Sequence, residues 1–92
     1  MADISVRQTA AFLRVYKKLH NNQKDAVDQA VAAIVTDPLV GEPKKGDLVG
    51  VYVYKFKCVR QQFLLAYEYD PMTQLLLLVG THENFYRNLK RE

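Results

Sequence analysis

The chain has 92 residues, of which 49% are hydrophobic and 25% charged, and its net charge is +3. That length suits one domain, residues 1–92, and the composition excludes a disordered, collagenous or disulfide-stapled protein. The single Cys58 cannot form an intramolecular disulfide, and the first residues, MADISVRQ, contain no apolar signal region. We therefore expect a soluble, cytoplasmic protein without a membrane partner.

Two amphipathic helices are predicted in the first part of the chain. Apolar residues recur at helical spacing in two stretches, first at Phe12, Val15, Tyr16 and Leu19, then at Val27, Ala30, Val31 and Ile34. The segment HNNQ separates the two stretches. Asp37 precedes Pro38 and ends the second helix, because the residue before a proline is pushed out of the α region. The pattern predicts a helical hairpin that needs another surface to cover its apolar side.

After the Pro- and Gly-rich connection DPLVGEPKKGDLVG, the period of the apolar residues changes to two. In VYVYKFKC, one face carries three aromatic residues and Cys58, and the opposite face carries Val51, Val53, Lys55 and Lys57. A second strand is predicted at residues 61–69. A third is predicted at residues 75–79, where LLLLV lacks alternation, as expected for a central strand covered on both faces.

The expected order is helix, helix, three antiparallel strands in a meander, and a short C-terminal helix. Residues 4–6 either add a short edge strand or lead into the first helix. This order predicts an α+β domain, with an N-terminal helical hairpin packed on a small antiparallel sheet of three to four strands.

Clustered cations are the first candidate functional feature. Lys55 and Lys57 leave the same strand face with their bases about 7 Å apart, which resembles the separation of successive phosphates along a nucleic-acid strand. Further candidate contacts to a polyanion are Arg60, Arg87, Lys90 and Arg91. The strand pattern alone also suits lysines on a solvated sheet face with no partner.

The second candidate feature is the start of the predicted C-terminal helix. His82 and Tyr86 are one turn apart and share a helix face with Phe85 and Leu89, and Thr81 is placed to cap the helix. An imidazole at a helix start beside a phosphate is suited to proton transfer. The same histidine is also compatible with simple packing against its apolar neighbours.

Several catalytic schemes do not fit the sequence. The two histidines and one cysteine are not at zinc-ligand spacing, there is no phosphate-binding glycine loop, and the only serine is Ser5. RNA cleavage by the substrate's own 2′-hydroxyl needs only a base, an acid for the leaving oxygen, and cations around the phosphate. We therefore expect neither a metal nor a cofactor.

Four segments spread over nearly the whole chain resemble the RelE/ParE superfamily of bacterial type II toxins. They are the helix pair ending in DP, then GDLVGVYVYKFK, FLLAYEY and LLLLVGTHENFYRNL. The end of the last strand at His82 looks most like the YafQ-type branch, where a histidine takes part in mRNA cleavage on the ribosome. Lys55 and Lys57 are similar to lysines of the RelE branch that bind the reacting phosphate, and Tyr86 stands near a functional tyrosine of RelE-like toxins.

The sequence departs from both catalytic patterns. Leu64 stands where many members have an arginine, His82 stands where the RelE branch has an arginine, and the YafQ-type histidines of the preceding strands are absent. The ParE branch shares the fold and poisons DNA gyrase, so fold likeness does not choose between the activities.

The resemblance implies the toxin of a type II toxin-antitoxin system, with a separate antitoxin protein as its partner. The main expectation is a ribosome-dependent mRNA endonuclease in which His82 and Tyr86 serve proton transfer. Lys55 and Lys57 would hold the scissile phosphate, with further charge from Arg60 or Arg87. The alternatives are a gyrase poison and a non-catalytic remnant that only binds the antitoxin.

Overall fold

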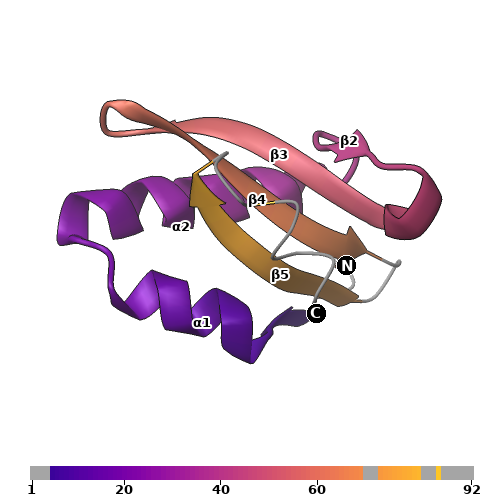
Figure 1. Ribbon diagram of the computed structural model, residues 1–92, viewed down its shortest axis with the longest axis horizontal. Coiled ribbons are helices and arrows are strands. Elements are labelled where there is room, and N and C mark those ends of the chain that lie inside the picture. The colour runs from indigo at the N-terminus through magenta and orange to yellow at the C-terminus, as the bar shows by residue number, and fades with distance from the viewer. Residues whose placement is uncertain (1–4, 70–72, 82–84, 86–92) are drawn as a thin grey trace.

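Two helices pack on one face of a five-stranded sheet in the computed structural model, which describes residues 5–69, 73–81 and 85 (Figure 1). The sheet has the order β1-β5-β4-β3-β2, with the strands β1 (Ser5–Gln8), β2 (Glu42–Pro43), β3 (Val51–Cys58), β4 (Gln61–Tyr69) and β5 (Thr73–Thr81). Strands β3, β4 and β5 form the predicted antiparallel meander. The predicted α+β class and the three long strands are confirmed.

The sheet nevertheless has more strands than the three to four that we predicted. Strand β1 runs parallel to β5, so the N-terminal residues form an edge strand and the sheet is not wholly antiparallel. The unexpected strand is β2, where Glu42 pairs with Val53 and Pro43 with Tyr52. Two residues inside a Pro- and Gly-rich connection give no alternating pattern, and a proline is compatible with a strand only at an edge.

The two predicted helices are α1 (Ala10–Lys17) and α2 (Asn21–Thr36). The Thr9 hydroxyl caps α1 by accepting a hydrogen bond from the Phe12 amide at 3.1 Å. The apolar sides of both helices cover the sheet face that carries Phe63, Leu65, Tyr67, Leu76 and Val79. Within the described ranges, no helix is long and apolar enough to cross a lipid bilayer.

A β-bulge explains why the run LLLLV does not alternate. Ala66 pairs with Leu78 and Tyr67 with Leu76, so Leu77 is an extra residue on β5. Leu76 and Leu78 therefore reach opposite faces although they are two positions apart. The Thr9 side chain donates a hydrogen bond to the Leu77 carbonyl at 2.6 Å, which pairs a backbone group beside the bulge.

The connection from α2 to β3 is held to the sheet by one buried tyrosine. The Tyr67 hydroxyl accepts a hydrogen bond from the Gly41 amide at 3.1 Å and donates one to the Pro38 carbonyl. Burial raises the pKa of Tyr67, which keeps the hydroxyl protonated and able to donate. A Cβ atom on Gly41 would lie 2.6 Å from the Tyr67 hydroxyl oxygen, so only glycine fits this close approach.

Replacing Tyr67 with phenylalanine should lower the free energy of unfolding by about 2 kcal/mol, because two loop backbone groups lose their partner in a buried setting. Urea denaturation followed by circular dichroism would measure the change. Tyr69→Phe is the matched control, since the Tyr69 hydroxyl makes no hydrogen bond to another described residue. Equal stability of the two variants would contradict the role assigned to the Tyr67 hydroxyl.

The β3–β4 hairpin turns through Val59 and Arg60, between the paired residues Cys58 and Gln61. Val59 has a φ of 63°, in the left-handed region that two-residue hairpins require at this position and that glycine usually fills. A β-branched residue there carries strain of about 1–3 kcal/mol. The Val59 side chain is 47% exposed, so packing of the side chain does little to offset that strain.

Candidate functional site

The sheet face opposite the helices carries Val51, Val53, Lys55 and Lys57 from β3, and we call it the lysine face. One half of this face is apolar, because Val51 and Val53 form a buried cluster with Leu64, Ala66, Leu78 and Phe85. Phe85 is helical and only 2% exposed, so it covers that half. The half with Lys55 and Lys57 is open to solvent. The lysine face is therefore divided into a covered apolar part and an exposed basic part.

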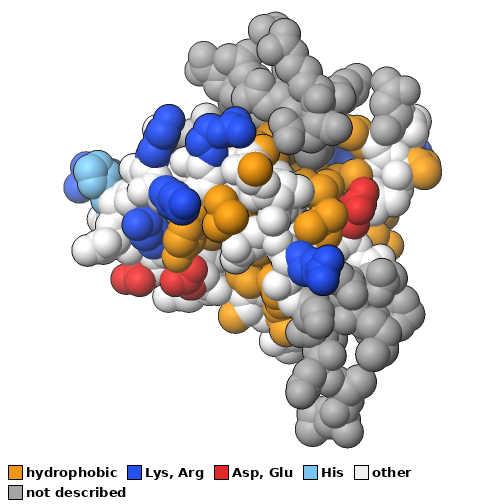
Figure 2. Space-filling view, turned by 90° about the horizontal axis from the view of Figure 1, so that it is seen from below, with side chains coloured by type: hydrophobic (Ala, Val, Ile, Leu, Met, Phe, Trp, Pro, Cys, Tyr) orange, Lys and Arg blue, Asp and Glu red, His pale blue; other side chains and the backbone are white. Residues whose placement is uncertain are grey.

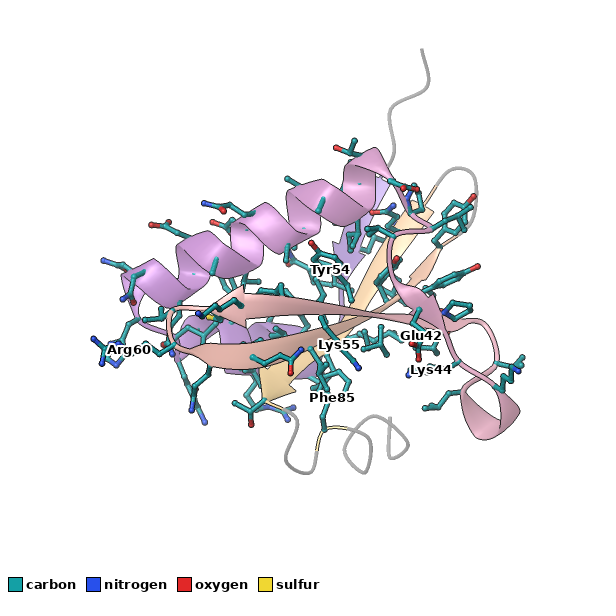
Figure 3. The ribbon with its side chains drawn as sticks, turned by 90° about the horizontal axis from the view of Figure 1, so that it is seen from above. Glu42, Lys44, Tyr54, Lys55, Arg60 and Phe85 are labelled. Atoms are coloured by element: carbon teal, nitrogen blue, oxygen red, sulfur yellow. The ribbon has the colours of Figure 1, made fainter. Side chains whose placement is uncertain are left out.

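The exposed basic part adjoins a hollow of about 440 Å³ at the β3–β4 hairpin. Its lining consists of three cations, two amide side chains and one aromatic residue: Lys55, Lys57, Arg60, Gln61, Gln62 and Phe56. Figure 3 shows Lys55 extending toward the side where Phe85 lies, whereas Tyr54 points toward α2 and Arg60 lies at the hairpin end. The structure thus brings together the three predicted phosphate contacts that fall within the described residues.

The register of the sheet connects this hollow to the end of β5. Lys55 pairs with Leu64, and Leu64 pairs with Gly80, so these three residues form one row across the sheet. Neighbouring strands are separated by about 4.8 Å, which puts the Cα atoms of Lys55 and Gly80 about 10 Å apart. A side chain that extends from the end of β5 on this sheet face would therefore be close to the lysine side chains.

Acidic residues among the described strands lie away from the hollow. Glu42 forms an ion pair with Lys44 at 2.6 Å, and the hydrogen bond from Lys44 lowers the pKa of Glu42. Figure 3 shows this pair at the opposite end of β3 from Arg60. Glu68 pairs with Val51 at that same distant end of the hairpin. The described lining of the hollow therefore carries three cations and no carboxylate, an arrangement that favours an anionic ligand.

The predicted site residues of the C-terminal segment, His82, Tyr86, Arg87, Lys90 and Arg91, lie outside the described residues. The neighbouring Thr81 is the last residue of β5 and pairs with Phe63. Cys58 is buried, as expected for a thiol of the core, and burial raises its pKa.

Sequence reasoning missed the two amide side chains of the hollow, those of Gln61 and Gln62. The register of the hairpin could have identified them, because a two-residue turn pairs Gln62 with Lys57 and Gln61 with Cys58. Amide side chains beside lysines offer hydrogen-bond donors to phosphate oxygens without adding charge.

An apolar hollow of about 300 Å³ lies beside the end of β5. Its lining comes from the end of α1, the start of β4, the end of β5 and the C-terminal segment: Val15, Leu19, Phe63, Leu78, Val79, Gly80, Thr81 and Phe85. The end of β5 thus has a basic hollow across the sheet and an apolar hollow beside α1.

Comparison with known proteins identifies the family. Residues 6–90 match the family model described as the ParE-like toxin of type II bacterial toxin-antitoxin systems. A search of curated protein sequences finds no match.

Solved toxin structures share the fold. A free RelE variant from E. coli aligns with a TM-score of 0.75 at 16% identity, covering 100% of this chain and 94% of that one. The RelBE2 complex of Mycobacterium tuberculosis aligns with a TM-score of 0.69 at 28% identity, covering 86% and 98%. YafQ from E. coli gives 0.60 at 13% identity, covering 87% and 94%. The resemblance to the RelE/ParE superfamily is confirmed, and the chain belongs to the ParE-like toxins of type II bacterial toxin-antitoxin systems.

Proposed function

We propose that this toxin is a ribosome-dependent mRNA endonuclease that uses the 2′-hydroxyl of the message as its nucleophile. The observation that supports the proposal is the hollow lined by Lys55, Lys57 and Arg60, which shares a row of the sheet with the end of β5. Cations at this spacing suit a phosphodiester and its neighbour along one strand.

In the proposed reaction the 2′-oxygen attacks the adjacent phosphorus, and the bond from phosphorus to the 5′-oxygen of the next nucleotide breaks. The 2′-hydroxyl gives up its proton to a base, and the leaving 5′-oxygen receives a proton from an acid. The products are a 2′,3′-cyclic phosphate and a 5′-hydroxyl. Negative charge grows on the phosphate oxygens in the transition state, where Lys55 and Lys57 would stabilise it.

His82 is the proposed base or acid, and Tyr86 would position or share the proton transfer. Consecutive Cα atoms are about 3.8 Å apart, so covalent geometry keeps His82 within about 8 Å of Gly80. Gly80 shares the row of Lys55, and Phe85 packs on the lysine face. These relations support a site assembled from β3 and the segment that follows β5. Arg60 or Arg87 would add positive charge to this site, and Lys90 and Arg91 would make further contacts to RNA.

The hollow is open and shallow for an enzyme that must hold a message in a reactive geometry. We propose that the ribosome supplies that geometry, because a strand already fixed in place needs only catalytic groups from the toxin. The toxin would then act in the cytoplasm, as a single domain formed by residues 1–92.

A cognate antitoxin is the second proposed partner. Two similar structures are complexes, the intact RelBE toxin-antitoxin complex of E. coli and a RelE variant bound to an antitoxin peptide. We propose that a separate antitoxin binds this chain likewise and covers or distorts the basic hollow.

The alternative function is that of a gyrase poison. We retain this alternative because the matching family is described as ParE-like toxins. The two functions differ in the target of the toxin, which is mRNA on the ribosome in one case and DNA gyrase in the other. They also differ in whether cellular mRNA is cleaved. A non-catalytic protein that only binds the antitoxin would leave both messages and DNA intact.

Expression of the toxin should produce new 5′ ends within a translated reporter message, detected by primer extension, and His82→Ala should abolish them. The expected loss is about 10²–10⁴-fold, the usual contribution of general acid-base catalysis. A reporter with a disrupted start codon is the control for ribosome dependence. Intact messages together with a DNA-damage response would decide for the gyrase poison, and intact messages without one for the non-catalytic protein.

A further inference from the structure

Two side chains in the basic hollow differ from the others in their hydrogen-bonding chemistry. The lysine and arginine side chains only donate hydrogen bonds, whereas the amides of Gln61 and Gln62 each carry an acceptor oxygen beside a donor nitrogen. Phosphate oxygens accept hydrogen bonds, so a phosphate can use the amide nitrogen but not the amide oxygen. The two amide oxygens are therefore suited to a part of the ligand other than its phosphates.

The alternation of β4 places the two glutamines on different faces of the sheet. Phe63 lies on the face covered by the helices and Leu64 on the lysine face, and successive residues of a strand alternate between faces. Gln62 therefore extends from the lysine face, as Leu64 does, and Gln61 extends from the face of Phe63. Of the two amides, that of Gln62 shares its face with the lysines of the hollow.

Gln62 lies directly beside Lys57, its partner across the β3–β4 hairpin. The Cβ atoms of such opposed residues are about 4.5–5.5 Å apart, so the amide and the ammonium group can contact one bound nucleotide. The Gln62 side chain is exposed and makes no hydrogen bond to another described residue. By contrast, Gln74 on β5 is buried and donates a hydrogen bond to the Ile34 carbonyl at 2.7 Å. The donor and the acceptor of Gln62 are thus available to a ligand.

Positive charge does not by itself distinguish the hollow from other surfaces of the molecule. Figure 2 views the molecule from the side opposite to Figure 3 and shows Lys and Arg side chains gathered there as well. Every nucleotide carries the same phosphate, so contacts from cations position a strand without reading its sequence, which is read at the edges of the bases. Selection among messages therefore needs a group with the hydrogen-bonding pattern of Gln62.

We propose that Gln62 reads an adenine beside the scissile phosphate and so determines where the toxin cuts a message. This inference rests on the proposed function, because it takes the message as the ligand of the hollow. A glutamine amide matches the outer edge of adenine, where N6 donates a hydrogen bond and N7 accepts one, and this edge stays accessible when the base is paired. Gln62 Oε1 would accept from N6 and Nε2 would donate to N7, while Lys57 holds the phosphate. At the same edge guanine presents two acceptors, uracil only an acceptor, and cytosine only a donor.

The test is cleavage of ribosome-bound reporter messages in which the base on either side of one cut is changed to each of the four in turn. Primer extension after reaction with the full chain would give the cleavage rate for each base. We expect adenine to be cut roughly 5- to 150-fold faster than the other bases at one of the two positions, the usual discrimination of a bidentate contact.

Gln62→Met keeps the length of the side chain and removes its hydrogen bonds, so this variant should cut all four bases at similar rates. Gln62→Glu keeps acceptors and loses the donor, so its preference should move to cytosine, whose N4 amino group donates. Gln61→Met is the matched control, because it changes the same residue type in the same hollow on the other sheet face, and it should keep the preference for adenine. The exposed position of Gln62 predicts that the melting temperature changes little.

Several results would overturn the role of Gln62. They are a wild-type toxin that prefers a base other than adenine or none, a Gln62→Met variant whose rate falls by one factor at every base, and a Gln61→Met variant that loses the preference equally. Cleavage without base preference would overturn this inference and leave the proposed function standing. A wild-type toxin that cleaves no message would overturn the proposed function and this inference together.

Discussion

Alanine at both Lys55 and Lys57 should lower the rate of message cleavage on ribosomes by roughly 10⁴-fold. Removing one preorganised electrostatic group from a catalytic site commonly costs about 10²–10³-fold, and here two adjacent cations of one hollow are lost together. The remaining Arg60 leaves some charge at the site, so the loss is not expected to be complete. Single-turnover primer extension on programmed ribosomes would measure the rate.

The control for this prediction is Arg7→Ala with Lys45→Ala, which removes the same charge from exposed positions outside the hollow. We expect that variant to cleave at nearly the wild-type rate and to arrest growth. Both pairs are surface residues, so urea denaturation should show changes within about 0.5 kcal/mol for each substitution. If the Lys55 and Lys57 variant cleaved messages at the normal rate, the assignment of the hollow would be wrong.

Phe85→Ala should lower the free energy of unfolding by about 3–4 kcal/mol, the usual cost of truncating a buried aromatic residue. Phe85 is 2% exposed and covers Val53, Leu64 and Leu78 on the lysine face. A domain of this size is stable by only about 5–14 kcal/mol, so the change removes a large share. Each kcal/mol shifts the melting temperature by about 4–8 °C, which differential scanning calorimetry would resolve.

Phe85→Leu is the matched control, because it keeps an apolar side chain on the sheet and should cost less than about 1.5 kcal/mol. Phe85 also follows His82 closely in the chain, so loosening it should reduce cleavage even well below the melting temperature. A Phe85→Ala variant as stable as the wild type would show that the apolar part of the lysine face does not need this cover.

Much of the fold could be predicted because local pattern and tertiary burial agree. The strand Val51–Cys58 alternates, and Gln61–Tyr69 is a short apolar run that is buried on both faces; the bounds of both match the prediction closely. Strand β2 could not be predicted, since a two-residue strand has no period of its own. Its pairing follows from the position of α2 and from the bonds that Tyr67 makes to the connection. The bulge at Leu77 was equally hidden, because a run of leucines does not reveal which residue is unpaired.

The candidate site was predictable where it depends on one strand and less so where it depends on the register between strands. The spacing of Lys55 and Lys57 indicated a shared face, and in the structure both residues line one hollow. Gln62 joins that hollow only because the hairpin turn opposes it to Lys57, which requires the turn length to be known. The roles of His82 and Tyr86 stay predictions.

The hydrogen bond between Thr9 and Leu77 closes a loop of 68 residues, and the parallel pairing of β1 with β5 closes the same one. Contacts of such high sequence separation form late, because the chain must first lose the entropy of a long loop. During synthesis the first strand has no partner until the last strand is made, and the meander must form before β1 can join it. A truncated translation product that lacks β5 therefore has no partner for β1. The complete sheet can form only when nearly all of the chain has been synthesised.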